Sequence, residues 1–269
     1  MIDTNLLNKI HNIDCFEILA QLPDESIDAM IIDPPYNNTE LSYDLIKFPH
    51  EKWFAELIRV AKPNCNIVLF ASGKFHYKLW SIGEKYHRYD CIWDKYPQVT
   101  NGLSAGRMPL TQHEYVMLFT KELHRDRLVY NHGVKYTGKS YKGSKSQHTT
   151  AGDRIASIKY IKENENDRFP TTVIRINKQI DRGHCANECI HPSEKPFKLI
   201  KYLVEMYSNE NMVVLDTCSG SGVLADVCLH TNRKFICTEI DKDFYNKSIK
   251  RLQYNLEYEQ LDTGEFIKK

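Results

Sequence analysis

The sequence predicts an α/β fold built on a doubly wound, mostly parallel sheet with helices on both faces. Short apolar runs alternate with helical patterns along most of the chain, which is the strand–helix order of such folds. Several runs are continuous rather than alternating, as is typical of parallel strands that are buried on both faces. The chain has 269 residues, of which 42% are hydrophobic and 26% charged, enough for one large domain with a substantial core.

Each expected element follows from the local pattern. Strands are expected where apolar residues run together, at 9–13, 27–32, 66–71, 88–93, 115–120, 212–215 and 234–238. Helices are expected where apolar residues recur every three or four positions, at 16–22, 53–62, 74–86, 196–208 and 244–259, with another after the glycine turn that follows residue 216. Pro63 is expected to end the second of these helices.

The middle of the chain differs in composition from both ends. Residues 121–162 contain ten basic residues against three acidic ones, with tyrosines, glycines, serines and threonines between them and no clear periodicity. We interpret this as a basic insertion and divide the chain into 1–120, 121–190 and 191–269. The net charge of the whole chain is only +1, which excludes a uniformly basic nucleic-acid coat, so any basic surface is local.

The sequence favours a cytoplasmic location. No apolar run approaches the ~20 residues that a membrane-spanning helix requires. The first ten residues, MIDTNLLNKI, lack the basic and then apolar pattern of a signal peptide. The eight cysteines are scattered along the chain, so we expect reduced thiols.

A glycine turn follows the expected strand 212–215. Asp216 ends the strand, and Gly220 and Gly222 allow a tight turn and close approach of a ligand to the backbone. Glu239 ends the next strand, where a carboxylate can accept hydrogen bonds from both hydroxyls of a ribose. This pattern favours an adenosine-type cofactor. The chain lacks G-x-G-x-x-G, since position 225 is Ala, and it lacks a phosphate-binding G-x-x-x-x-G-K-[ST] loop. The alternative is a turn that merely connects a strand to a helix.

A second turn, Asp33-Pro34-Pro35-Tyr36, follows the buried strand 27–32. Two prolines stiffen this turn and remove N–H donors, leaving carbonyl oxygens and the Asp33 carboxylate as acceptors. Such a group suits an amine donor, and Tyr36 offers a flat face to a planar ring. The turn therefore indicates a pocket for the exocyclic amine of a nucleobase. The alternative is a proline turn with a solvent-facing aspartate.

Three motifs together resemble those of the S-adenosylmethionine-dependent DNA amino-methyltransferases. They are DPPY at 33–36, HPSEKP at 191–196 and DTCSGSG at 216–222. Their order, with the basic insertion after DPPY, resembles the β group, whose chains are circularly permuted relative to other methyltransferases. The resemblance extends over nearly the whole chain.

The resemblance implies a role for each matching residue. The catalytic residues that it implies are Asp33, Pro34, Pro35 and Tyr36. Asp33 and the Pro34 carbonyl would accept hydrogen bonds from the target amine, and Tyr36 would stack on the flipped base. Thr217, Cys218 and Val223 depart from the family pattern, which usually has Pro, Phe and Thr there. The residues expected around S-adenosylmethionine are Asp14, Cys15, Asp33, Ser193, Lys195, Asp216, Ser219, Gly220, Gly222 and Glu239.

The resemblance implies methylation of the N6 amine of adenine in double-stranded DNA. Methylation of the N4 amine of cytosine is the nearest alternative, because DPPY is mostly associated with adenine in this family and SPPY with cytosine. An RNA or protein-glutamine methyltransferase and a catalytically silent DNA-binding module are the others. A homodimer, a cognate restriction endonuclease, and a bacterial or phage protein held on the nucleoid through DNA are compatible with the chain.

The region 121–190 is expected to recognise the target DNA through its cations and polar side chains. The residues expected to contact DNA are Arg107, Lys135, Lys139, Lys142 and Lys145. His184, Cys185, Cys189 and His191 include ligand types that zinc favours, but they lack the spacing of a structural zinc site, so no metal is expected.

Overall fold

The computed structural model describes most of the chain. The described residues are 1–37, 48–122, 124, 127–132, 136–137, 167–177, 193–254, 258–260 and 266–268. Within these residues, none of the helices has the length and apolar character that crossing a membrane requires.

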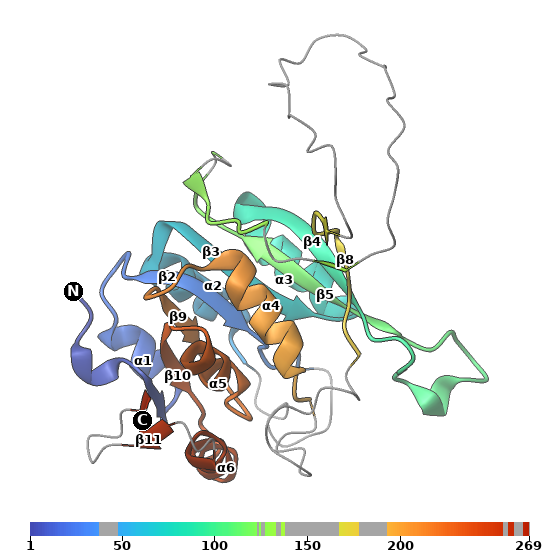
Figure 1. Ribbon diagram of the computed structural model, residues 1–269. Helices are drawn as coiled ribbons and strands as arrows, with labels where there is room; N and C mark the ends of the chain where they lie inside the picture. The colour runs from blue at the N-terminus through green and yellow to red at the C-terminus, as the bar shows by residue number, and fades with distance from the viewer. Residues whose placement is uncertain are drawn as a thin grey trace.

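An eight-stranded sheet forms the centre of the molecule, in the order β1-β10-β9-β2-β3-β5-β4-β8 (Figure 1). Only β5 runs antiparallel to its neighbours β3 and β4, so the expected mostly parallel sheet is confirmed. The strands are β1 (Lys9–His11), β2 (Ile27–Ile32), β3 (Ala61–Ala71), β4 (His87–Asp94), β5 (His113–Phe119), β8 (Val173–Arg175), β9 (Val213–Asp216) and β10 (Lys234–Thr238).

Helices cover both faces of this sheet. The helices are α1 (Cys15–Gln21), α2 (His50–Val60), α3 (Lys74–Gly83), α4 (Phe197–Tyr207), α5 (Val223–His230) and α6 (Lys242–Tyr254). Leu199 of α4, Leu224 of α5 and Leu252 of α6 share one hydrophobic core. Ile18 of α1 and Trp53 of α2 belong to a second core, together with Phe75 of α3. This two-sided cover is the doubly wound arrangement that the sequence predicts.

Short strands of the described chain also pair outside the main sheet. β6 (Tyr136–Thr137) pairs with β7 (Asp167–Arg168), and β11 (Tyr258–Gln260) pairs with β12 (Phe266–Lys268), each pair antiparallel. β8, by contrast, comes from the expected insertion 121–190 and extends the main sheet beyond β4.

Most expected elements agree with the structure, and the limits of several differ by a few residues. α2 ends at Val60 rather than at Pro63, which lies within β3, so the prediction that Pro63 ends this helix was wrong. β2 and β10 have the expected bounds, whereas β3 begins at Ala61, directly after α2, where it pairs with Ile27 before an irregularity in the register. The expected helix 244–259 ends instead at Tyr254, because residues 258–260 pair with β12. A strand partner further along the chain overrides a helical pattern that local spacing alone supports.

The sheet topology brings distant parts of the chain to one edge. β1 pairs with β10 and β2 pairs with β9, so strands from the two ends of the chain are interleaved. The carboxyl ends of β2, β9 and β10 therefore meet at one edge, where ligands bind in open α/β sheets. β4 also ends there, and the antiparallel β5 begins there, because Asp94 is paired with His113.

Candidate active site

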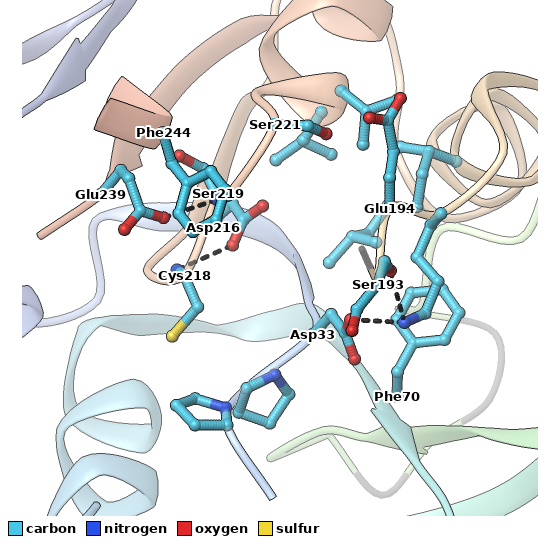
Figure 2. Close-up of a pocket in the computed structure, with 18 of the residues that line it drawn as sticks. Asp33, Phe70, Ser193, Glu194, Asp216, Cys218, Ser219, Ser221, Glu239 and Phe244 are labelled. Carbon is cyan, nitrogen blue, oxygen red and sulfur yellow. Dashed lines mark hydrogen bonds and ion pairs between the residues drawn. The ribbon is translucent and has the colours of Figure 1, made fainter. Parts of the chain in front are cut away.

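A cavity of about 1090 Å³ opens at this edge of the sheet (Figure 2). Its walls come from the ends of β1, β2, β9 and β10 and from the segment before α4. The expected site residues that line it are Asp14, Cys15, Asp33, Pro34, Pro35, Tyr36, Ser193, Lys195, Asp216, Ser219, Gly220 and Glu239. Gly222 lies just behind this wall, where it precedes α5. The structure thus brings two motifs that are distant in sequence, DPPY and the glycine turn, to one cavity.

The Asp-Pro-Pro-Tyr turn points acceptors into the cavity. The Tyr36 hydroxyl donates to Asp33 Oδ1 at 2.9 Å, and the Lys195 ammonium donates to Asp33 Oδ2. The Pro35 carbonyl oxygen lies 2.7 Å from His50 Nε2. Within the described residues, no hydrogen bond reaches the Pro34 carbonyl, which is therefore available as an acceptor.

Tyr36 already has an aromatic neighbour. Its ring stacks on Phe75 of α3, with centroids 4.7 Å apart and planes 18° from parallel. Phe75 is buried and so holds the Tyr36 ring from one side.

The glycine turn orients Glu239. Gly220 and Gly222 have φ angles of +49° and +74°, which favour glycine. A Cβ on Gly222 would also lie 2.8 Å from Ser248 Cβ. The Gly220 N–H donates to Glu239 Oε2 at 2.7 Å, and the Asp241 N–H donates to Oε1 at 2.8 Å. These two backbone donors fix the Glu239 carboxylate at the end of β10.

Asp216 and Ser219 lie beside the Glu239 carboxylate and have little access to solvent. Asp216 accepts from the Cys218 N–H at 3.0 Å. Burial raises the pKa of Asp216 to about 8, and the nearby carboxylates of Asp33 and Glu239 contribute to this rise. Burial also raises the pKa of Glu239. The Ser219 hydroxyl is buried and has no hydrogen-bond partner among the described residues, so it offers a polar group to a ligand.

Asp14 and Cys15 lie after β1 at the start of α1. The Asp14 side chain caps this helix by accepting from the Phe16 N–H at 2.7 Å. Burial raises the pKa of Cys15 to about 12, which keeps this thiol neutral. Asp14 therefore has a local structural role in addition to its place in the cavity wall.

The wall is strongly acidic. Among the described residues that form it, the lysines are Lys95 and Lys195, and none is an arginine. Its seven carboxylates are Asp14, Asp33, Glu114, Glu194, Asp216, Glu239 and Asp241. Such a surface favours a ligand that carries positive charge, as S-adenosylmethionine does on its sulfonium and ammonium groups.

Sequence reasoning missed Glu114 and Lys95, which line the same cavity. Glu114 lies near the start of β5 and Lys95 directly follows β4, and their side chains pair at 3.1 Å. A glutamate inside the apolar run HEYVMLF was a usable signal, because a buried acid in a strand requires a partner.

Of the residues expected to contact DNA, the structure describes Arg107. It is exposed in the connection between β4 and β5, whose residues 97–100 line the cavity. The four lysines of the expected DNA-contacting set, and the His and Cys residues considered for zinc, lie outside the described residues. They are Lys135, Lys139, Lys142, Lys145, His184, Cys185, Cys189 and His191.

Comparisons with known proteins agree with this geometry. A family model described as DNA methylase matches residues 27–250. The type II methyltransferase M.HpaI of Haemophilus parainfluenzae is 26% identical over 250 residues, covering 89% of this chain and 72% of that protein.

Two solved structures share the fold. The complex of M1.HpyAVI with SAM has a TM-score of 0.62 at 22% identity, covering 91% of this chain and 98% of that one. The PvuII DNA methyltransferase, which is cytosine-N4-specific, has a TM-score of 0.63 at 17% identity, covering 89% of this chain and 84% of that one.

The parallel sheet, the glycine turn with its acid partner and the acidic cavity define an S-adenosylmethionine-dependent methyltransferase. Because the family model spans most of the sequence, the chain belongs to the DNA methylase family, and it is a DNA methyltransferase enzyme.

Proposed function

We propose that this enzyme methylates the N6 amine of adenine in double-stranded DNA. The observation that carries the proposal is one cavity walled by both the Asp-Pro-Pro-Tyr turn and the glycine turn. Asp33 in the first position of the Asp-Pro-Pro-Tyr turn supports adenine as the target base, because the family resemblance associates DPPY mostly with adenine. The order of the motifs supports the permuted β group.

The end of the cavity near Glu239 fits the cofactor. The Glu239 carboxylate is held by two backbone N–H groups and keeps lone pairs for the hydroxyls of a ribose. Ile240, with 65% of its surface exposed, and Phe244 provide apolar surface beside it for an adenine ring. The Ser219 hydroxyl, unpartnered within the described chain, and the Asp216 carboxylate offer polar contacts next to them. When bound there, S-adenosylmethionine supplies a methyl group on a positively charged sulfur.

The other end of the cavity fits the target amine. Asp33 and the Pro34 carbonyl would accept its two hydrogens, which orients the nitrogen lone pair toward the methyl donor. Since an exocyclic amine on an aromatic ring is a weak nucleophile, fixing this geometry supplies much of the rate enhancement. The base must leave the duplex to reach this depth, and Tyr36, held by Phe75, would stack on it.

The proposed roles of the three chain segments and the proposed partners are based on the sequence alone. Residues 121–190 would form the target-recognition region, between catalytic residues at 1–120 and cofactor-binding residues at 191–269. The basic residues in that region would bind phosphates. We also propose, on the basis of family resemblance, a restriction–modification context with a cognate endonuclease, and a homodimer.

The test is expression in a methylation-deficient bacterial host, followed by single-molecule sequencing of the host DNA. We expect N6-methyladenine in one short sequence motif, and none in cells that express Asp33→Ala. Modified cytosine in a fixed motif would instead support N4-cytosine methylation. That second candidate has a specific basis, because the cytosine-N4-specific relative shares this fold. Absence of any modified base, with soluble protein that binds S-adenosylmethionine, would overturn DNA as the proposed substrate.

A further inference from the structure

Four charged side chains of alternating sign form a row in the cavity wall. The Lys195 ammonium contacts Asp33 Oδ2 and lies 3.4 Å from Glu114 Oε2. Glu114 Oε1 lies in turn 3.1 Å from the Lys95 ammonium. The row runs from Asp33 after β2 to Lys195 before α4, Glu114 on β5 and Lys95 after β4, so four separate segments must fold to assemble it.

The two lysines of the row have little contact with water. Lys195 and Lys95 are only 7% and 5% exposed. The remaining neighbours of the Lys195 ammonium are the Phe70 ring, 5.0 Å from its centroid, and the Ser193 carbonyl at 3.5 Å. A buried ammonium in these surroundings requires carboxylate partners, and Asp33 and Glu114 are its only ion-pair partners among the described residues.

We propose that Lys195 is a positioning residue that holds Asp33 as an oriented carboxylate anion, and that Glu114 positions Lys195. The Lys195 ammonium binds Oδ2 and the Tyr36 hydroxyl donates to Oδ1, so two donors fix the plane of the carboxylate, and Oδ1 keeps a second lone pair for the target amine. Glu114 holds Lys195 against Asp33, and Lys95 holds Glu114. This inference rests on the proposed role of Asp33 as the acceptor of the amine.

The charges around Asp33 explain why it needs a cation. Burial raises the pKa of Asp33, and the Glu114 carboxylate raises it as well, whereas Lys195 and the Tyr36 hydroxyl lower it. Asp216 also faces Asp33, and each carboxylate disfavours ionisation of the other. A protonated Asp33 would present an O–H donor to an amine that requires an acceptor.

These contacts determine the direction in which each of two substitutions should shift the pKa of Asp33. Lys195→Met removes the cation but keeps burial and Glu114, so the pKa of Asp33 rises and the anion forms only at higher pH. Glu114→Gln removes a neighbouring negative charge and keeps an oxygen that accepts from lysine, so the pKa of Asp33 falls. A merely structural role for the two residues predicts no such opposite shifts.

The direct test is a pH titration of the Asp33 carboxyl by carbon-13 NMR on protein labelled at aspartate. The Asp33 signal is identified by its loss in Asp33→Asn. We expect the midpoint to move up by about one pH unit or more in Lys195→Met and down in Glu114→Gln. An unchanged midpoint in Lys195→Met, or shifts of the same sign in both variants, would overturn the proposal. If Lys195→Met does not fold, Lys195→Gln, which also removes the charge but keeps a polar side chain, is the deciding variant, with the same upward shift expected.

The functional test measures single-turnover methyl transfer from tritiated S-adenosylmethionine to unmethylated bacterial chromosomal DNA between pH 6 and pH 9. We expect Lys195→Met to lose about tenfold or more near neutral pH and to recover as the pH rises, because Asp33 then ionises. Lys195→Arg, which keeps the charge, should retain most activity. Lys201→Met, at an exposed lysine paired with Glu205 on α4, is the matched control and should behave as wild type.

The two tests separate the proposals. If the wild-type enzyme transfers no label to DNA, the proposed function fails, while the NMR titration still decides whether Lys195 and Glu114 control Asp33. If the wild type is active and Lys195→Met loses activity equally at every pH, this inference fails and the proposed function stands.

Discussion

Asp33 and Glu239 lie at the same edge of the sheet, yet their surroundings differ in kind. Asp33 is held by two side-chain groups, the Lys195 ammonium and the Tyr36 hydroxyl. Glu239 is held by two backbone N–H groups of a tight turn, which leave it little freedom. Glu239 thus lies beside the glycine turn that would bind the cofactor, whereas Asp33 lies in the turn that would bind the base.

This difference predicts a division of roles that substitution can separate. Asp33→Ala should abolish methyl transfer and leave affinity for S-adenosylhomocysteine within about threefold, since Asp33 would contact the base. Glu239→Ala should weaken that affinity by about tenfold or more, because hydrogen bonds to a charged group contribute about 1.5–3 kcal/mol. Isothermal titration calorimetry and tritium transfer measure the two effects. Equal loss of binding in both variants would contradict the division.

At the scale of single residues, the sequence motifs predicted which residues line the cavity, but not which of their side chains pair with one another. The expected cavity residues do converge on one cavity, because each motif carries its own turn at a strand end. The Lys195–Asp33 pair, 162 positions apart in the chain, was not predicted. Glu114 and Lys95 belong to no motif, and their pairing depends on the register of β4 against β5.

At the scale of elements, apolar patterns predicted where strands lie but not how they run. β5 has the same continuous apolar character as β2, yet it is antiparallel to β3. Burial on both faces determines the composition of a strand, whereas the length and path of its connections determine its direction. The antiparallel course of β5 is what places Glu114 at the active edge.

The connection between β4 and β5, residues 95–112, projects from this edge. Its stem lines the cavity at 97–100 and is closed by a bridge between Thr100 and Thr111. Its far part exposes Leu103 completely and Met108 by half, and Arg107 is exposed beside them. A cation next to apolar surface, on a segment whose stem lines the cavity, suits contact with DNA beside the flipped nucleotide.

We therefore expect Arg107→Ala to weaken DNA binding several-fold and to lower the slope of log affinity against log salt by about one, since one phosphate contact is lost. Affinity for S-adenosylhomocysteine should not change. Fluorescence anisotropy with a labelled duplex at several salt concentrations measures the affinity for DNA and its dependence on salt. Lys201→Ala, far along the chain on α4, serves as a control for the loss of one surface cation. An unchanged salt slope in Arg107→Ala would exclude the contact.

At the scale of the whole molecule, the two ends of the chain complete one sheet. β1 and β2 come from the first 32 residues, yet their partners β10 and β9 come from residues 213–238. Neither the segment before residue 120 nor the segment after residue 191 contains the full set of strands around the cavity. Buried residues from both segments share each of the two cores. The two segments thus form one packed unit, within which the proposed catalytic and cofactor-binding roles would be divided.

This packing predicts a single unfolding transition for the main body of the enzyme. Differential scanning calorimetry should show one peak, since neither segment can keep its strands paired after the other unfolds. S-adenosylhomocysteine at about 100 times its Kd should stabilise the folded state by about 2.7 kcal/mol and raise Tm by about 5 °C. Because the cavity is walled by both segments, the whole peak should move. Two peaks, of which the ligand shifts only one, would instead show that the cofactor-binding segment folds independently and that the interleaved strands contribute little to its stability.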